Sequence, residues 1–255
     1  MIHSTTIIHP KAQIGSGCEI GPYCVIGEHV TLGDGCQLRS HVVIDGHTKL
    51  GKENEIFPFA SLGLKTQDLK WKGGVTRTEI GDGNTFREYV TVHSATGDGE
   101  VTRIGSHNTI LAYCHVAHNC TLGDRIIMSN VATLAGHVTV EDQAVIGGLA
   151  AVHQFCRIGK MAMIGGCSKV VQDVPPFMIA DGNPAETRTV NKVGLERNGI
   201  AEEAQISLRS AYKILFRERL TIPNALAKIG SELPPLPEIK YLVQFIRASE
   251  RGISK

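Results

Sequence analysis

Large aliphatic side chains recur at every sixth position over the first two thirds of the chain. From Ile8 to Val170, 25 of the 28 positions in this phase are large and apolar, and the exceptions are Asp68, Gly74 and Asp98. A period of six fits neither an α-helix, which repeats every 3.6 residues, nor a heptad coiled coil. It predicts a solenoid of triangular cross-section, with three short strands in each 18-residue coil and the aliphatic side chains inside.

Two further positions of each hexad have a restricted composition. The residue directly after the aliphatic one is often glycine, and we expect this glycine to permit the backbone of the corner. The residue four places after the aliphatic one is mostly small or apolar, which suits a crowded interior. Six of the seven cysteines take this position and are predicted to be buried, compact hydrophobes: Cys18, Cys24, Cys36, Cys114, Cys120 and Cys156.

This pattern resembles the hexapeptide-repeat proteins, whose fold is an all-β, left-handed parallel β-helix. The left hand is implied by the resemblance alone. Stacked coils are expected ~4.8 Å apart, the spacing of neighbouring strands. The two breaks in the phase predict loops ejected from the prism, near residues 64–79 and 94–103.

The hexads stop after Val170, where Pro175-Pro176 and the turn at 181–184 close the solenoid. From about Thr189 the apolar spacing becomes helical. We therefore predict a β-helix over 1–187 and a helical C-terminal domain over 188–255. The expected helices are Val190 to Arg197, Glu202 to Glu218, Ile222 to Leu233 and one that begins at Pro237.

Composition and charge exclude several classes of protein. The formal net charge is +1, so a nucleic-acid binder built on bulk charge is not expected. No apolar run approaches the ~20 residues of a membrane-spanning helix, and the N-terminus does not read as a signal peptide. Together with unpaired cysteines, these features predict a cytoplasmic protein. Residues 188–255 hold 12 Lys and Arg against 7 Asp and Glu, a net +5 that would suit an acidic partner.

Four histidines lie close together in the repeat frame. Residues 18 apart stack on adjacent coils, so positions 118, 136 and 154 form one column, with His137 and His153 each one residue away. His118, His137, His153 and Gln154 therefore line one edge, and His115 lies on the face before it. Such a strip is either a set of surface or interface histidines or an active-site groove in which one histidine is a general base. No G-x-S-x-G elbow or phosphate-binding P-loop competes with the second interpretation.

Several strings along the chain carry a more specific resemblance. In order, they are Gln67-Asp68-Leu69-Lys70, His115-Val116-Ala117-His118, Leu134-Ala135-Gly136-His137, Ala151-Val152-His153-Gln154-Phe155-Cys156, Gly165-Gly166-Cys167-Ser168 and Asn191-x-x-Gly194-Leu195-x-Arg197. They resemble the acyl-carrier-protein-dependent UDP-N-acetylglucosamine O-acyltransferases that begin lipid A synthesis. The resemblance covers nearly the whole chain.

The resemblance implies transfer of a (3R)-3-hydroxyacyl group from acyl carrier protein to the sugar 3-hydroxyl, with no cofactor and no metal. His118 matches the general base, and a backbone N–H around Gly136 and His137 matches the donor to the thioester oxygen. Positions that bind substrate in the family correspond here to Gln67, Asp68, Lys70, His115, His137, His153, Gln154, Asn191 and Arg197. Gly166 matches the position that sets acyl length, where glycine leaves room for a longer chain.

The chain departs from its relatives at a few of these positions. Asn119 follows the predicted base where many relatives have aspartate, so orientation of the ring would fall to an amide. Val193 and Asn198 replace an acid and a second arginine of the tail. Some relatives prefer a 3-amino sugar, and the sequence does not distinguish the two acceptors.

The histidine edge supplies only one wall of a groove, and we expect a homotrimer that builds the other wall. Two alternatives are open at this point. A γ-class carbonic-anhydrase-like prism would hold Zn²⁺ with three histidines across a subunit boundary, and stoichiometric zinc would reveal it. A non-catalytic scaffold would lose nothing when His118 is removed.

Overall fold

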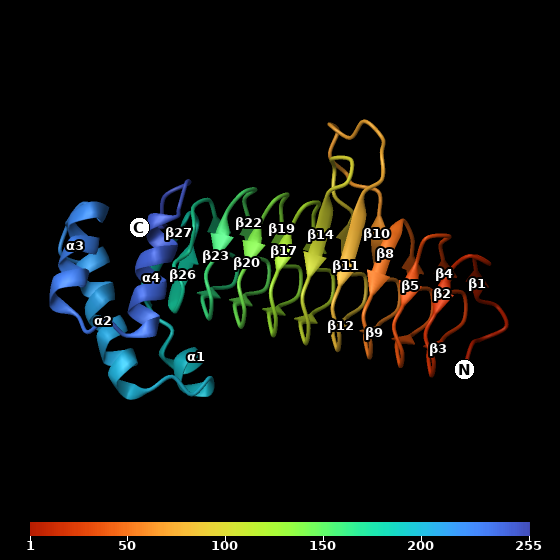
Figure 1. Cartoon of the computed structure of the whole chain (residues 1–255), viewed down its shortest axis with the longest axis horizontal. Coiled ribbons are helices and arrows are strands. Elements are labelled where there is room, and N and C mark those ends of the chain that lie inside the picture. The colour runs from red at the N-terminus through yellow and green to blue at the C-terminus, as the bar shows by residue number, and fades with distance from the viewer.

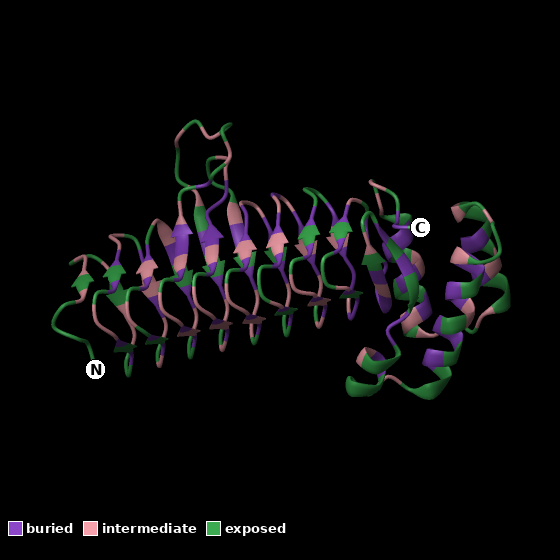
Figure 2. Ribbon diagram, turned by 180° about the vertical axis from the view of Figure 1, so that it is seen from behind, coloured by how far each residue is buried: buried purple, intermediate pink, exposed green.

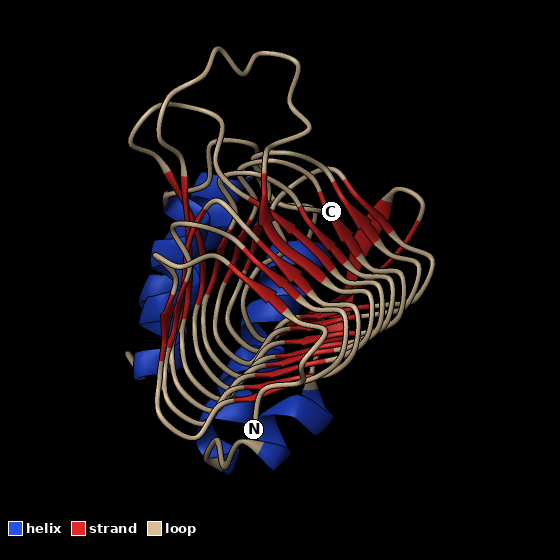
Figure 3. Ribbon diagram, turned by 90° about the vertical axis from the view of Figure 1, so that its right-hand side faces the viewer, coloured by secondary structure: helices blue, strands red, loops and turns tan.

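A computed structural model describes residues 1–255 as a triangular prism of parallel strands, capped at one end by helices (Figures 1 and 3). Three parallel sheets form the faces of the prism, and each 18-residue coil adds one short strand to each face. The triangular solenoid is the one expected from the hexad period, and the fold is the left-handed β-helix that the resemblance implies. In Figure 3, the view runs along the prism and both ejected loops project from one corner.

Most strands are two residues long because each face of a coil is short. The first face holds β1 (Ile7–Ile8), β4 (Val25–Ile26), β7 (Val43–Ile44), β10 (Ser61–Leu64), β13 (Thr91–His93), β16 (His115–Val116), β19 (Thr133–Leu134), β22 (Ala151–Val152) and β25 (Lys169–Val170). The second holds β2 (Gln13–Ile14), β5 (Thr31–Leu32), β8 (His47–Leu50), β11 (Arg77–Ile80), β14 (Val101–Ile104), β17 (Thr121–Leu122), β20 (Thr139–Val140) and β23 (Arg157–Ile158). The third holds β3 (Glu19–Ile20), β6 (Gln37–Leu38), β9 (Glu55–Ile56), β12 (Thr85–Phe86), β15 (Thr109–Ile110), β18 (Ile127–Met128), β21 (Val145–Ile146), β24 (Met163–Ile164), β26 (Met178–Gly182) and β27 (Ala185–Val190).

The ladder register explains why the hexad phase survives the two loops. Paired residues are usually 18 apart, but β8 pairs with β11 at a separation of 30 and β11 with β14 at 24. Both separations are multiples of six. The loops span residues 65–76 and 94–100 and are shorter than predicted. Their last predicted residues belong to β11 and β14, which are four residues long.

The inward positions form one continuous core of 42 buried residues (Figure 2). The inward aliphatics from Ile20 onward and the six predicted cysteines are buried, which confirms that interpretation. Ile8 and Ile14 in the first coil are partly buried, and Cys167 is exposed. The core also contains a polar column that the sequence analysis did not identify. Asn54, Asn84 and Asn108 are at most 1% exposed, and each hydrogen-bonds to the next coil through its side chain.

The predicted role of the hexad glycines is wrong in one respect. Gly33 is not in the left-handed region, but a Cβ on it would lie 2.5 Å from the Gly51 carbonyl carbon of the next coil. Glycine is needed here because stacked coils approach closely. The left-handed φ values fall at other corner positions, and many of these residues are not glycine, for example Tyr89 at +60° and His137 at +59°.

The predicted boundary at 187/188 falls inside a strand. β26 and β27 form an antiparallel hairpin that extends the third sheet, and Val190 ends β27 instead of opening a helix. Val190 is buried with the helical cluster, so its apolar side chain fits either pattern. The helices are α1 (Lys192–Arg197), α2 (Glu202–Phe216), α3 (Ile222–Glu232) and α4 (Pro237–Arg247).

A second core of 18 buried residues joins the helices to the last coils, where Met161, Phe177 and Met178 contribute to it. Arg157 of β23 lies over the Phe245 ring of α4, with the guanidinium carbon 4.1 Å from the ring centroid. No helix has the length and apolar character needed to cross a bilayer.

Candidate active site

Three corners run along the prism, and each can be defined by its residues with left-handed φ. Asn119, His137 and Phe155 mark the corner between the first and second faces, which we call the histidine corner. Tyr89, Tyr113 and Cys167 belong to the aromatic corner, between the third and first faces. Gln143 and Met161 belong to the third corner, between the second and third faces.

His118 lies at the histidine corner with its side chain 14% exposed. Its Nδ1 is 3.0 Å from Asn119 Oδ1, and its Nε2 is 3.7 Å from Asp68 Oδ2. Asn119 therefore contacts one ring nitrogen and the ejected loop approaches the other. The amide that replaces the aspartate of relatives does contact the ring.

Gly136 stacks directly on His118, as the 18-residue spacing predicts. A Cβ on Gly136 would lie 2.4 Å from His118 Cε1 and 2.5 Å from Nε2, so any side chain here would displace the ring. The backbone N–H of Gly136 makes no hydrogen bond within the chain, whereas that of His137 donates to the His118 carbonyl at 3.0 Å. Of the two backbone N–H groups at the predicted donor position, that of His137 is used by the coil ladder, and that of Gly136 makes no hydrogen bond.

Two histidines behind His118 are held neutral. His115 Nδ1 is 2.7 Å from Thr91 Oγ1, and burial, assisted by His93 and His118, lowers the pKa of His115 to about 4. His93 is 6% exposed, and burial lowers its pKa as well. Burial disfavours the cationic form of a histidine, so these rings do not compete as cations near neutral pH.

The remaining members of the strip extend along the corner. His137 meets His118 edge to face, with ring centroids 5.2 Å apart, and stacks on Phe155 at 4.8 Å. Burial, followed by the influence of His118, lowers the pKa of His137. His153 and Gln154 are exposed one coil further on.

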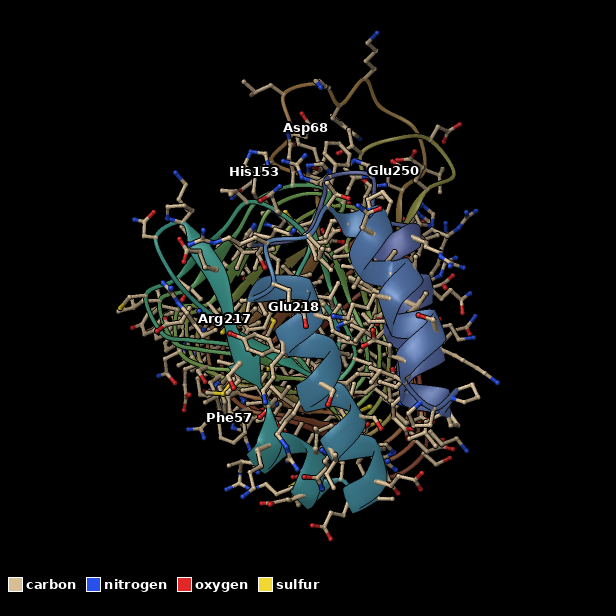
Figure 4. All side chains as sticks on the ribbon, turned by 90° about the vertical axis from the view of Figure 1, so that its left-hand side faces the viewer. Phe57, Asp68, His153, Arg217, Glu218 and Glu250 are labelled. Atoms are coloured by element: carbon tan, nitrogen blue, oxygen red, sulfur yellow. The ribbon has the colours of Figure 1, made fainter.

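The first ejected loop delivers Asp68 to the histidine corner (Figure 4). Asp68 Oδ1 accepts from the Lys70 backbone N–H at 2.9 Å, which leaves Oδ2 directed at His118. Gln67 and Lys70 are exposed and their side chains make no hydrogen bond. Thr66 and Thr96 join the two loops through their hydroxyls, 3.0 Å apart.

Asn191 and Arg197 do not join this cluster within one chain. Asn191 is buried, caps α1 by accepting from Gly194 N–H at 3.0 Å, and donates to the Met161 carbonyl at 2.9 Å. Asn198, next to the exposed Arg197, contacts Gln143. Both contacts place α1 at the third corner, away from the histidine corner.

Gly166 lies at the aromatic corner and is exposed. Its φ is not in the left-handed region, and a Cβ on it would meet only the Gly148 carbonyl, at 3.3 Å. Gly166 therefore lies on the outer wall of the prism, as expected, and a side chain there would need a small shift of the Gly148 carbonyl.

Comparisons with known proteins identify the family. A model described as UDP N-acetylglucosamine O-acyltransferase, domain 2, matches residues 173–254, and the bacterial transferase hexapeptide model matches 1–33 and 11–46. The acyl-[acyl-carrier-protein]–UDP-N-acetylglucosamine O-acyltransferase of Thermodesulfovibrio yellowstonii is 53% identical over 256 residues, which cover 100% of this chain and 99% of the relative. The chain belongs to this acyltransferase family.

Solved structures agree with the UDP-N-acetylglucosamine acyltransferase assignment. The chain superimposes on LpxA of Acinetobacter baumannii with a TM-score of 0.96 and 46% identity, covering 100% and 99% of the two chains. The UDP-N-acetylglucosamine acyltransferase of Bacteroides fragilis gives a TM-score of 0.98 and 38% identity, with 100% of both chains covered. The carbonic-anhydrase and scaffold alternatives are therefore set aside in favour of an acyltransferase.

Some residues of the site were missed by the sequence analysis. Glu100 accepts from Asn119 Nδ2 at 2.7 Å, and Arg251 Nη2 lies 3.5 Å from His153 Nδ1. Neither has a local signal, because Glu100 lies in a loop and Arg251 is 98 residues from His153. His93 was visible only as one more histidine ahead of the second loop.

Proposed function

We propose that this protein transfers a (3R)-3-hydroxyacyl group from acyl carrier protein to the 3-hydroxyl of UDP-N-acetylglucosamine, the first step of lipid A biosynthesis. The observation that carries the proposal is the setting of His118. Asn119 Oδ1 contacts Nδ1, Asp68 Oδ2 lies 3.7 Å from Nε2, and Gly136, whose backbone N–H makes no hydrogen bond, stacks against the ring on the next coil. A candidate base and an unpaired backbone donor thus lie on neighbouring coils at the same corner.

In the proposed reaction, His118 Nε2 takes the proton of the sugar 3-hydroxyl as that oxygen attacks the thioester carbonyl. Negative charge moves to the carbonyl oxygen, which the Gly136 N–H stabilises. The carbon–sulfur bond then breaks, and the departing sulfur of the carrier takes the proton from the His118 imidazolium. The products are the acylated sugar and the free carrier thiol.

The polar residues around the base suit a sugar nucleotide. Asp68 and Lys70 on the loop, with Gln67, are positioned to hydrogen-bond the sugar, while His115 and His137, kept neutral by burial, can donate or accept. His153 and Gln154 extend the site toward the nucleotide. The acyl chain would then run along the outer wall toward Gly166, which leaves space for a longer chain.

We further propose that the working unit is a trimer. Exposed apolar rings stack along the aromatic corner, with Tyr23, Phe59, Tyr89 and Tyr113 between 43% and 58% exposed. An apolar stripe of this kind on a monomer marks an interaction surface. Arg197 at the third corner would then reach the nucleotide bound to a neighbouring chain, carried by the helix that Asn191 caps; its forked donors suit a diphosphate.

The acidic partner predicted from the tail would be the acyl carrier protein. Arg188, Arg217, Arg219 and Lys255 line a hollow of about 240 Å³ beside α2, together with one acid, Glu186, which pairs with Arg188. A surface of this charge favours encounter with an acidic protein. Location in the cytoplasm, where carrier and sugar nucleotide would meet the protein, stays a prediction.

The direct test is an assay of the purified protein with UDP-N-acetylglucosamine and 3-hydroxyacyl carrier proteins of several lengths. His118→Ala should lower kcat by about 10²–10⁴-fold, the usual effect of losing a general base, without creating a core cavity. His107→Ala removes an exposed histidine from the third corner and should leave kcat unchanged. Near-normal turnover of His118→Ala at saturating donor would contradict the assignment.

A further inference from the structure

Glu100 connects the second ejected loop to the base through one intervening side chain. Its Oε2 accepts from the Gly97 backbone N–H at 2.8 Å and from Asn119 Nδ2 at 2.7 Å. These hydrogen bonds, the one from Asn119 foremost, lower the pKa of Glu100, with smaller contributions from His137 and His118. The loop therefore places an ionised carboxylate against Asn119.

The hydrogen bonds of Asn119 determine which way its amide points. Nδ2 faces the Glu100 carboxylate, which only accepts, and Oδ1 faces the Thr96 backbone N–H at 3.0 Å, which only donates. The Asn119 backbone is fixed as well, since its N–H donates to Thr102 Oγ1 at 2.8 Å and its φ is +60°. A reversed amide would put donor against donor at Thr96 and acceptor against acceptor at Glu100.

The amide orientation in turn selects one tautomer of His118. Because Oδ1 is an acceptor and lies 3.0 Å from Nδ1, the neutral ring must carry its proton on Nδ1. Nε2, which lies 3.7 Å from Asp68 Oδ2 and so beyond hydrogen-bond distance, is then unprotonated and has the lone pair that a base needs. Asn119 alone could present either end of its amide, so the selection depends on the groups that hold it.

We propose that Glu100 is a positioning residue for His118, acting through Asn119 to fix the tautomer and the ring orientation of the base. The inference rests on the proposed role of His118. Glu100 touches neither the ring nor the expected position of the reacting atoms. Its carboxylate lies behind the Asn119 amide, and of these two groups only the amide contacts the ring.

The first experiment compares variants of Glu100 in the full-length protein. Glu100→Ala removes the acceptor and should lower kcat about tenfold, the effect of one lost hydrogen bond to a charged group, with KM for the sugar nucleotide unchanged. Glu100→Gln keeps an acceptor oxygen, so its kcat should be only slightly below that of the unmodified protein. Asp98→Asn is the matched control, because Asp98 lies on the same loop but accepts from Val75 N–H and does not contact Asn119.

The second experiment reverses the sign of the effect. Asn119→Asp brings a second carboxylate against Glu100, where both cannot stay ionised, and should lower kcat more than tenfold. Adding Glu100→Gln removes the repulsion and offers an amide N–H, so the double variant should be faster than Asn119→Asp alone. The same Glu100→Gln change therefore slows the enzyme that keeps Asn119 and speeds the Asn119→Asp variant.

A purely structural loop contact predicts a different result. In that case Glu100→Gln would lower, or leave unchanged, the activity in both backgrounds, and the losses would add. That outcome, or a rise in KM with kcat unchanged in Glu100→Ala, would overturn the proposal. His118→Ala is measured in parallel. If this variant stays active, the assignment of His118 as the base fails. If it is inactive, but the losses from the Glu100 and Asn119 substitutions simply add, only the positioning role of Glu100 fails.

Discussion

Two glycines of the site differ in what a side chain would meet. At Gly136 an added Cβ would strike the His118 ring, so the backbone position and the base require each other. At Gly166 the φ is not in the left-handed region, and a Cβ would meet one backbone atom, the Gly148 carbonyl oxygen, at a tight 3.3 Å. A small shift of that carbonyl would make space for a side chain, and we expect the glycine to leave room for the acyl chain.

We expect Gly166→Met to shift acyl preference toward shorter chains. A methionine there would stand on the wall along which the chain is proposed to run, and each excluded methylene forgoes ~0.8 kcal/mol of burial. Turnover with 3-hydroxyacyl carriers of increasing length measures the effect, and short donors should react almost as before. An equal loss with all donors would show that the residue does not limit chain length.

The buried histidines predict how stability depends on pH. The pKa of His115 is lowered to about 4 in the folded chain, against ~6.5 when unfolded, so below pH 6.5 the unfolded state binds a proton that the folded state does not. The free energy of unfolding should fall by about 2 kcal/mol from pH 7 to pH 5 for this residue. Denaturant titrations at both pH values measure the fall, which His115→Gln should reduce. An unchanged fall in the variant would contradict the assignment.

At the scale of elements, the interior of the prism is not purely apolar. Asn84 donates from Nδ2 to Asn54 Oδ1 and to the Gly81 carbonyl, and its own Oδ1 accepts from Asn108 N–H. The column lies in the coils that eject the loops. Its amides hydrogen-bond coil to coil, so they stabilise the coils from which the loops with Asp68 and Glu100 project.

Asn84→Ala should destabilise the fold by about 1–3 kcal/mol, because it leaves buried partners without hydrogen bonds. Asn130→Ala removes an exposed asparagine at a coil corner and should change stability by less than about 0.5 kcal/mol. Urea unfolding at one protein concentration compares the two. Equal effects would mean that the buried column contributes little.

At the scale of the molecule, the groups proposed to bind one substrate lie on different corners. His118 and Asp68 meet at the histidine corner, whereas α1 with Arg197 follows the third corner. The aromatic corner between them is exposed along its length, with Tyr89 stacked on Phe59 at 5.0 Å and on Tyr113 at 4.8 Å. Side-by-side packing of prisms would cover the rings and bring the corners of different chains together.

Light scattering should therefore give three times the 27.5 kDa mass of one chain. Tyr89→Arg puts a charge into the ring column and should shift the mass toward one chain with loss of activity, since a desolvated unpaired charge opposes association. Tyr89→Phe keeps the ring and should remain assembled and active. A stable, active single chain would refute the trimer.

The prism could be predicted from the sequence alone, because a period of six over 25 of 28 positions places every large aliphatic side chain inside the same triangular coil. The histidine corner could be located as well, because residues 18 apart stack on adjacent coils. His118 does lie against Gly136, as this spacing predicts. The sequence strings around these histidines are specific enough to indicate the family without any knowledge of side-chain contacts. Local regularity carries this information, and no long-range contact is needed to read it.

The positions of the irregular segments could not be predicted from the sequence and follow from the folded chain. The loops have no period, so the approach of Asp68 to His118 and of Glu100 to Asn119 depends on how each loop folds back over the corner. The ladder also decided that His137 N–H is used while Gly136 N–H is free. Asn191 caps α1 and donates to the Met161 carbonyl, 30 residues away in the sequence. Such a long-range hydrogen bond is visible only in the folded chain.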